Sequence, residues 1–214
     1  GRTISDMRLS SQEARGPQAP RLEATPSRVA AMLLPLSALV LAMADVPGAA
    51  LTPWTPGTLD IHQIVTGRGN SAFLQLPDGS TLLVDAGAAG DIPYADPKPD
   101  GSKRPGEWIA AYINRVLPPG APRRLDAALV THIHIDHMGG LGDVHAALPI
   151  RRLIDRGFPG YDYPEPIPEA LMKIYRPFVD AVRAKGGAVE RARAGAADQI
   201  RLTNPGSVTA PFEI

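Results

Sequence analysis

The sequence contains no cysteine, and this absence narrows the chemistry that the protein can use. Without cysteine the chain forms no disulfide bond and offers no thiolate to a metal ion, so any metal ligands must be nitrogen or oxygen atoms. The absence does not decide the cellular compartment, because proteins inside and outside the cytoplasm can both do without cysteine.

The chain also lacks an excess of either charge, since 22 basic and 22 acidic residues give a formal net charge of zero at pH 7. Proteins that bind DNA or RNA depend on clustered Lys and Arg to contact phosphates. The pair Arg151-Arg152 is too short to form such a cluster. We therefore predict a small-molecule substrate rather than nucleic acid, and the sequence indicates no obligate protein partner.

Only one long apolar run is present, in residues 29–44, and it contains no charged residue. Its sixteen residues fall short of the roughly twenty that a membrane-spanning helix needs. The run ends in Ala42-Met43-Ala44, a small-x-small sequence that is typical of a signal-peptide cleavage site. Pro35 and the lack of a polar face argue against a buried core helix.

These features divide the chain into three regions. Residues 1–28 are polar, contain three prolines and are typical of a disordered tail. We interpret residues 29–50 as the apolar and cleavage part of a signal peptide, whose translation starts at Met7 or upstream. An uncleaved membrane anchor is the alternative. Residues 51–214 then form one globular domain, and the mature protein is expected to be secreted or periplasmic.

Three of the five histidines lie within six residues, at His132, His134 and His137, together with Asp136. In extended backbone, side chains two residues apart point the same way, so the first two imidazoles can reach one ion. A turn that begins near Asp136 could direct its carboxylate and the imidazole of His137 toward a second ion. A solvated polar turn is the alternative, but four potential ligands in six positions favour a metal site.

Nitrogen and oxygen ligands without thiolates suit zinc, although iron and manganese are possible. A water molecule held between two such ions loses a proton near neutral pH, and the resulting hydroxide attacks a carbonyl or phosphoryl centre. We predict that Asp136 is the catalytic residue, which holds this hydroxide in line and can accept its proton.

The residues THIHIDHMGG at positions 131–140 resemble the signature of the metallo-β-lactamase superfamily of metallohydrolases. The residues LLVDAG at 82–87 are similar to an earlier strand of that family, which ends in an Asp that braces the metal loop. Residues 67–79 resemble the opening hairpin of the branch related to DNA-uptake competence proteins. That branch usually carries an acidic residue where Asn70 stands.

The resemblance, which covers about residues 59–155, implies an α/β fold, the αββα sandwich, of which this chain supplies the first half and the start of the second. It also implies two zinc ions in the complete protein. The metal ligands that it implies are His132, His134, Asp136 and His137. Asp85 and Thr131 are expected to support these ligands without binding the metal.

A complete two-metal site of this family needs a third His, a bridging Asp and another His from later in the chain. The sequence has no His after His145, starts without Met, and stops at Ile214 within a predicted strand. We therefore expect a fragment that binds zinc weakly. A family member that has lost its second ligand set is the alternative.

Periodicity and turn residues predict the elements of the domain and the loops beside the site. Strands are expected at 60–65, 72–76, 81–85, 125–131, 152–155, 188–191 and 199–202, and helices at 106–117, 139–148 and 168–184. Two long loops, 88–105 and 156–168, leave the carboxyl ends of strands, where ligands gather in open α/β sheets. We expect four aromatic residues of these loops to wall the metal cleft: Tyr94, Phe158, Tyr161 and Tyr163. Rigid surface connections are the alternative.

Three functions are consistent with the sequence. The first is a secreted zinc-dependent hydrolase that acts on β-lactams or other cyclic amides, lactones or thioesters, or phosphodiesters. The second is a competence-type nuclease-like domain, against which the neutral net charge argues. The third is a non-catalytic metal-binding or interaction module of the same fold. His62 and His145 match no ligand position of the family and are interpreted as ordinary structural histidines.

Overall fold

The computed structural model describes residues 51–92 and 96–208. The predicted tail, the signal-peptide region and the last strand, at 210–214, lie outside these residues, and so does Tyr94. Within the described ranges, no helix combines the length and apolar character that crossing a membrane would require.

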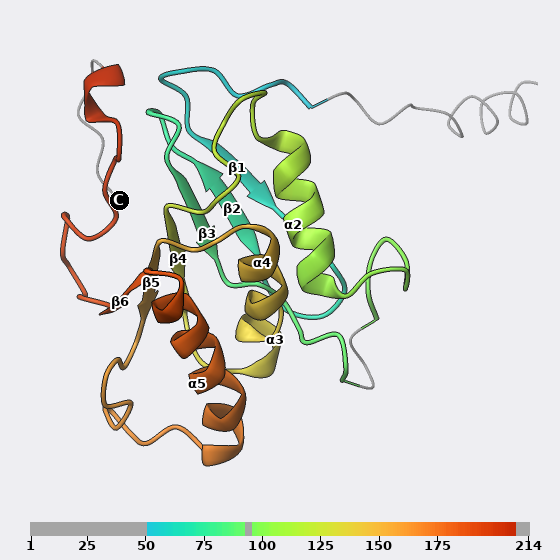
Figure 1. The fold of residues 1–214 in the computed structure, drawn as a ribbon, viewed down its shortest axis with the longest axis vertical. Coiled ribbons are helices and arrows are strands. Elements are labelled where there is room, and N and C mark those ends of the chain that lie inside the picture. The colour runs from blue at the N-terminus through green and yellow to red at the C-terminus, as the bar shows by residue number, and fades with distance from the viewer. Residues whose placement is uncertain (1–50, 93–95, 209–214) are drawn as a thin grey trace, which may run out of the picture. The chain divides into compact units, whose positions relative to one another are not determined.

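A six-stranded mixed sheet is the centre of the fold, and its strands follow one another in chain order (Figure 1). The first three strands pair antiparallel, and the remaining pairs are parallel. The strands are β1 Asp60–Gln63, β2 Ala72–Gln75, β3 Thr81–Val84, β4 Ala127–Leu129, β5 Arg152–Asp155 and β6 Ala188–Arg191. The parallel half therefore needs a crossover connection between each pair of strands.

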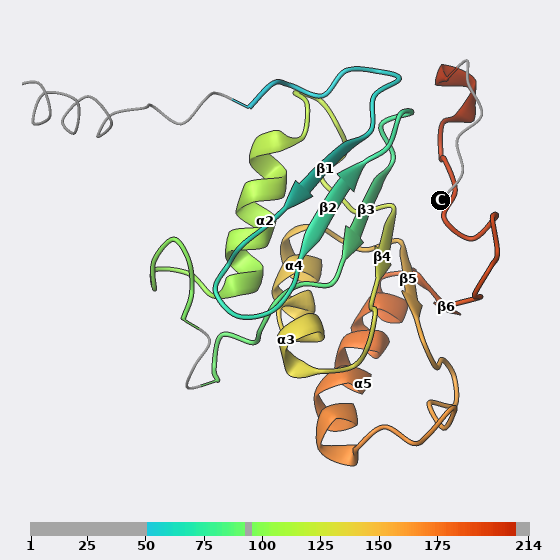
Figure 2. The ribbon, with the colours of Figure 1, turned by 180° about the vertical axis from the view of Figure 1, so that it is seen from behind.

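Those crossovers are helical, and Figures 1 and 2 together show that the helices cover one face of the sheet. The helices are α2 Pro105–Val116, α3 Ile135–Met138, α4 Leu141–Ala147 and α5 Glu169–Ala184. A short 3-10 helix, Pro205–Ser207, follows β6. Successive parallel strands joined by right-handed crossovers in one direction place their helices on the same side, which gives one helix layer.

The hydrophobic core fills the space between this helix layer and the sheet. In β2, Phe73 is fully buried and belongs to the core, whereas its neighbour Leu74 is only partly buried, as the two-residue period of a strand requires. Helix α2 contributes Ile109 and Ile113, four residues apart on one face. The helix ends before Pro118, which cannot continue it.

Most of the predicted elements are present, with shifted ends. Strands at 152–155 and 188–191 are confirmed, but the strand expected at 125–131 covers only Ala127–Leu129, with a single bridge from Leu125 to Ile150. The helix expected at 139–148 begins later, at Leu141. A separate helical turn, α3, precedes it and was not predicted.

The strand predicted at 199–202 is wrong, because this segment forms no strand. The side chain of Gln199, rather than its backbone, forms hydrogen bonds to the backbone of the segment that follows β6 and to the end of β6. Its Oε1 accepts the backbone N–H of Arg193 at 2.8 Å, and its Nε2 donates to the carbonyl of Arg191 at 2.9 Å. Side-chain hydrogen bonds of this kind compete with regular pairing.

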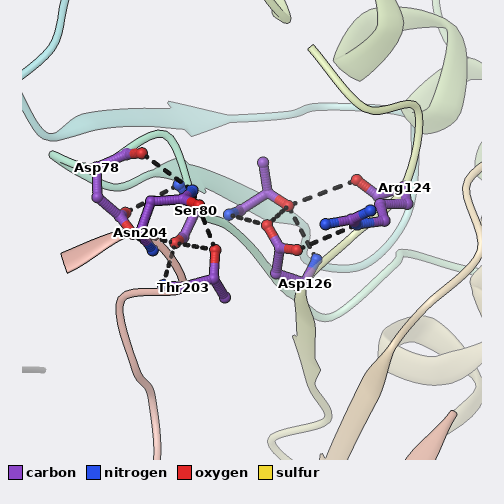
Figure 3. Close-up of polar contacts among 7 residues, drawn as sticks. Asp78, Ser80, Arg124, Asp126, Thr203 and Asn204 are labelled. Atoms are coloured by element: carbon purple, nitrogen blue, oxygen red, sulfur yellow. Dashed lines mark hydrogen bonds and ion pairs between the residues drawn. The ribbon is translucent and has the colours of Figure 1, made fainter. Parts of the chain in front are cut away.

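The segment after Gln199 is attached to the turn between β2 and β3 (Figure 3). The carboxylate of Asp78 accepts the N–H of Asn204 at 2.7 Å, and the hydroxyl of Ser80 accepts the N–H of Thr203 at 2.7 Å. Burial raises the pKa of Asp78, but its hydrogen bonds from Ser80 and Asn204 outweigh burial and hold the pKa below its ordinary value. The charged form of Asp78 therefore helps to hold two distant parts of the chain together.

The predicted fold class is confirmed: a mixed α/β fold consistent with a metallo-β-lactamase-like architecture. The described residues contain one sheet and one helix layer, which are two of the four layers of an αββα sandwich. The face of the sheet opposite the helices carries Leu82 and Ile154, which are both buried.

Candidate metal centre

Three loops meet at the ends of β1, β3 and β4 and form the frame of the candidate site. The N–H of Asn70 donates to the carbonyl of Asp136 at 3.2 Å, and the N–H of Ala86 donates to the carbonyl of His137 at 2.7 Å. The N–H of Gly87 donates to the carbonyl of Asn70 at 2.8 Å, which closes the set. These bonds fix the candidate metal loop, residues 131–140, through its backbone.

Two glycines allow this close approach of backbones. At Gly69, with φ +96°, a Cβ would lie 1.8 Å from the carbonyl oxygen of Asp136. At Gly139, a Cβ would lie 2.1 Å from the backbone nitrogen of Ala89. Any side chain at either position would force the loops apart.

The backbone of the candidate loop departs from the extended form expected as far as Thr131. Strand β4 ends at Leu129, a bend follows at Thr131-His132, and the N–H of His134 donates to the carbonyl of His132 at 3.1 Å. His134 itself is extended, with φ −114° and ψ 153°, and α3 begins at the next residue. The turn expected near Asp136 is therefore present as the first turn of this helix.

The structure brings the three imidazoles of the loop together. The ring centroid of His132 lies 3.9 Å from that of His137 and 4.7 Å from that of His134. Asp136 lies in the same helical turn as His137. Their roles as metal ligands, and the catalytic role of Asp136, stay predictions.

Asp85 supports the candidate metal loop through a buried carboxylate, and the residue is only 1% exposed. It accepts hydrogen bonds from the backbone N–H and hydroxyl of Thr131, at 2.9 and 2.7 Å, and from the side-chain amide of Asn70, at 3.4 Å. Its Oδ2 lies 2.7 Å from Nδ1 of His137. The backbone of Asp85 is left-handed, with φ 58°, a conformation that Asp tolerates better than most residues.

The Asp85 contact determines which nitrogen of His137 can face a metal. A carboxylate oxygen beside Nδ1 favours the tautomer in which Nδ1 carries the proton. Nε2 then keeps its lone pair, which can face a metal ion. His132 is similar, since its Nδ1 lies 3.1 Å from the hydroxyl of Thr131. Carboxylate–histidine pairs of this kind orient the imidazoles of many metal sites.

The electrostatics of His132 favour its neutral form. Burial lowers its pKa, the charges of His137 and His134 lower it further, and Asp85 and Asp136 act in the opposite direction. Neutral imidazole is the form that binds metal.

The residues fit zinc in donor type, but within the described part of the chain they are not arranged as a complete site. Nitrogen and oxygen donors without thiolates suit zinc. However, no group of three or more His, Cys, Asp or Glu residues within the described ranges is arranged so that it could hold a metal ion. The three imidazoles are therefore a partial ligand set in this structure.

The aromatic residues expected to wall the cleft have different places. Tyr163 is 69% exposed and lines a cavity of about 520 Å³ together with Leu129, Ile154 and Arg156, on the face of the sheet opposite the helices. Phe158 is partly buried and packs against the core. Tyr161 is buried in the core and also lines two small cavities of about 180 and 170 Å³. Its place on the wall of a metal cleft stays a prediction.

The reason for the burial of Tyr161 is Asp155, a residue that the sequence did not single out. This fully buried carboxylate accepts the N–H groups of Gly157 and Phe158, at 2.9 and 2.8 Å. It also accepts the hydroxyls of Tyr161 and Tyr175, at 2.8 and 3.0 Å. We call these five residues the Asp155 cluster. It ties the loop after β5 to helix α5.

Sequence reasoning also missed the contacts of Gly69 and Asn70 with Asp136 and Asp85. The glycine-rich hairpin was visible in the sequence, but its packing against a loop more than sixty residues away was not. The two remaining histidines have structural contacts. Nδ1 of His62 lies 3.0 Å from the hydroxyl of Tyr112, and Nδ1 of the buried His145 accepts the N–H of Ile150 at 3.1 Å.

Comparison with known proteins finds a family that the residues around this site resemble. Residues 64–161 match the family described as the Metallo-beta-lactamase superfamily, and this segment includes Asp85 and the whole candidate metal loop. The matched segment, which is less than half of the chain, is therefore similar to a metallo-beta-lactamase superfamily domain. Members of this superfamily are mostly metal-dependent hydrolases.

Among solved structures, a metallo-beta-lactamase from Cronobacter sakazakii (Enterobacter sakazakii), a HARLDQ motif mutant, is similar to this chain. The identity is 16% and the TM-score 0.36, over 71% of this chain and 51% of that chain. The chain thus spans about half the length of that enzyme. A search of the curated proteins finds no match.

Proposed function

We propose that this chain carries the zinc-binding part of a metal-dependent hydrolase that acts on a small molecule. The observation that supports the proposal is the convergence of three imidazole rings, with centroids 3.9 and 4.7 Å apart, beyond the carboxyl end of β4. This end of parallel strands is where α/β enzymes bind their ligands. The match of residues 64–161 to a superfamily of mostly metal-dependent hydrolases supports it independently.

Each residue of the loop has a distinct task in this proposal. His132, His134, Asp136 and His137 would hold zinc, which, when bound, supplies a Lewis acid and water that ionises near neutral pH. Asp85 orients His137 by accepting a hydrogen bond from its Nδ1–H. Thr131 connects Asp85 to His132 through its hydroxyl, which contacts both side chains.

Asp136 is the proposed proton acceptor. It occupies the first turn of α3, and its backbone carbonyl is fixed by the N–H of Asn70. A carboxylate on a fixed backbone can remove a proton from water in a constant direction during attack on a carbonyl or phosphoryl centre. β-Lactams and other cyclic amides, lactones, thioesters and phosphodiesters all present such a centre.

A non-catalytic metal-binding or interaction module is the second candidate. Its interaction form is supported because no group of three or more ligand residues in the described ranges is arranged to hold a metal ion. A competence-type nuclease-like domain is supported only by the hairpin at 67–79, and salt-dependent binding of DNA would be its sign.

The test compares zinc content and hydrolysis of a panel of lactams, lactones, thioesters and phosphodiesters between the full-length protein and its His134→Ala variant. His62→Ala is the matched control, because His62 contacts Tyr112 rather than the loop. We expect His134→Ala to lose both zinc and turnover while the control keeps both. Equal zinc and equal turnover in His134→Ala would remove the hydrolase proposal, and zinc without turnover in the wild type would favour the binding module.

We also propose that the protein is exported, with residues 29–44 as a cleaved signal or, alternatively, as a membrane anchor. The uncharged run and its small-x-small end support this. N-terminal sequencing of the mature protein from a secreting host should give Asp45 as the first residue. A mature protein that still contains residues 29–44 in the soluble cytoplasmic fraction would contradict export.

A further inference from the structure

Helix α2 has a second face besides the one that packs in the core. Ile109 and Ile113 are buried against the sheet. Trp108 and three residues that follow it at helical spacing lie on another side of the helix and are partly or fully exposed. This side forms one wall of a cavity of about 470 Å³, which we call the α2 pocket. Its lining residues are Ile64, Val65, Thr66, Lys98, Pro99, Trp108, Ala111, Tyr112 and Arg115.

The volume of the α2 pocket lies within the range of about 300–1,000 Å³ that is typical of small-molecule sites. Its aromatic walls are fixed in place. The indole N–H of Trp108 donates to the carbonyl of Asp100 at 3.1 Å, and the hydroxyl of Tyr112 lies 3.0 Å from Nδ1 of His62. Rings that are already held lose little freedom when a ligand binds, so the pocket is preorganised for a flat apolar group.

The charged residues of the α2 pocket are both cations, Lys98 and Arg115, and none of its lining residues is acidic. Lys98 pairs with Asp96 at 2.9 Å, but both side chains are largely exposed, so the pair is weak. A third cation is close, because Nζ of Lys103 lies 4.5 Å from the centre of the Trp108 ring. Lys103 also interacts electrostatically with the exposed carboxylate of Asp100. The excess of positive charge is therefore that of the lining residues Lys98 and Arg115, and it favours an anion.

The α2 pocket is separate from the candidate metal loop, because no residue of His132 to His137 lines it. Its own frame is set by a backbone hydrogen bond, from the N–H of Lys98 to the carbonyl of Thr66 at 3.1 Å. Binding in this pocket can therefore be measured without metal, and its result does not depend on the proposed hydrolase.

We propose that the α2 pocket binds a small organic anion with a flat aromatic body. The aromatic body lies beside Trp108 and Tyr112, and the carboxylate is bound by Lys98 and Arg115. Arginine and lysine both form charge-assisted hydrogen bonds with carboxylates, and the apolar walls exclude water from the ring of the ligand.

Isothermal titration calorimetry of the full chain with naphthalene-1-acetate, in buffer containing EDTA, tests the proposal. We expect one molecule to bind per chain, and we expect the neutral analogue naphthalene-1-acetamide to bind at least about fivefold more weakly. Absence of binding, or equal affinity for the two compounds, would overturn the proposal.

Variants locate the binding to this pocket. We expect the affinity for naphthalene-1-acetate to fall by about three- to tenfold in Arg115→Gln and in Lys98→Gln, because each variant loses one partly exposed ion pair. Ala111→Trp should abolish binding by filling the pocket, and because Ala111 is exposed this variant should unfold at the wild-type urea concentration. Arg123→Gln is the matched control, since Arg123 donates to the carbonyl of Asn114 outside the pocket. Wild-type affinity in folded Arg115→Gln and Ala111→Trp would place the binding elsewhere and reject the α2 pocket.

Discussion

At the scale of single residues, Asp85 connects the fold to the candidate metal loop. Its carboxylate accepts two hydrogen bonds from Thr131 and contacts Nδ1 of His137 and the amide of Asn70. The sequence predicted a supporting role from the resemblance of LLVDAG alone. It could not predict Asn70 as a donor, because the residue that the family resemblance led us to expect there is acidic.

Two replacements of Asp85 distinguish the effect of its charge on stability from the effect of its size and hydrogen bonds. Asp85→Asn keeps the size and tolerates the left-handed backbone, so it should lose about 1–2 kcal/mol of unfolding free energy. Asp85→Ala removes the acceptor of the N–H and hydroxyl of Thr131 and places alanine in a left-handed backbone, so it should lose about 3 kcal/mol or more. Urea unfolding measures both values. Equal losses in the two variants would show that the hydrogen bonds of Asp85 do not stabilise the loop.

Gly69 provides a sharper test, because the chain contains a matched control. Gly69→Ala places a methyl group against the carbonyl of Asp136, whereas a methyl group at Gly57, which has a similar φ of +88°, would meet nothing within 4 Å. We expect Gly57→Ala to lose about 1–2 kcal/mol from backbone strain alone. Gly69→Ala should lose about 2 kcal/mol more than that, from steric overlap. Similar urea midpoints for the two variants would contradict the close packing of the hairpin on the metal loop.

At the scale of elements, sequence patterns identified the strands and long helices better than their ends. Strand β5 and helix α5 were predicted nearly to the residue because apolar periodicity and flanking Gly and Pro residues define them locally. Helix α3 was missed because its four residues are too few to show a helical period. The strand predicted at 199–202 failed because Gln199 forms side-chain bonds to Arg191 and Arg193 that depend on the tertiary fold.

The Asp155 cluster predicts how stability depends on alkaline pH. Burial, followed by the charge of Asp155, raises the pKa of both Tyr161 and Tyr175 above the ordinary value of 10. Above pH 10 the unfolded chain therefore releases these protons while the folded chain retains them, so stability falls as the pH rises. The fall should be about 1.4 kcal/mol per pH unit for each tyrosine.

Urea unfolding between pH 9 and 11 measures this slope. We expect the fall of stability with pH to be smaller by the contribution of one tyrosine in each of the variants Tyr161→Phe and Tyr175→Phe. Each variant should also lose about 1 kcal/mol of unfolding free energy at neutral pH, because its hydrogen bond to Asp155 is missing. Tyr163→Phe is the control, because Tyr163 is largely exposed and makes no hydrogen bond to Asp155. Parallel slopes in wild type and both core variants would show that the cluster is not what couples the loop to helix α5.

At the scale of the whole molecule, the His cluster and the strands around it were enough to predict the fold class. They also indicated the superfamily whose model residues 64–161 match. The apolar sequence before His132 and the paired glycines after His137 limit the local geometry to a strand, a turn and a helix. The places of Tyr161 and of the α2 pocket could not be predicted. Both depend on which helix face turns toward which loop, and sequence periodicity does not determine this.

Zinc binding by the 214-residue chain tests the central claim most directly. Isothermal titration calorimetry at about pH 7.5 should show weak binding, because the described residues provide three close imidazoles but no complete ligand group. The binding should be lost in His132→Ala and His137→Ala and kept in His62→Ala and His145→Ala. Zinc binding that is unchanged in the two loop variants, or tight binding of two ions to the wild-type chain, would contradict the account.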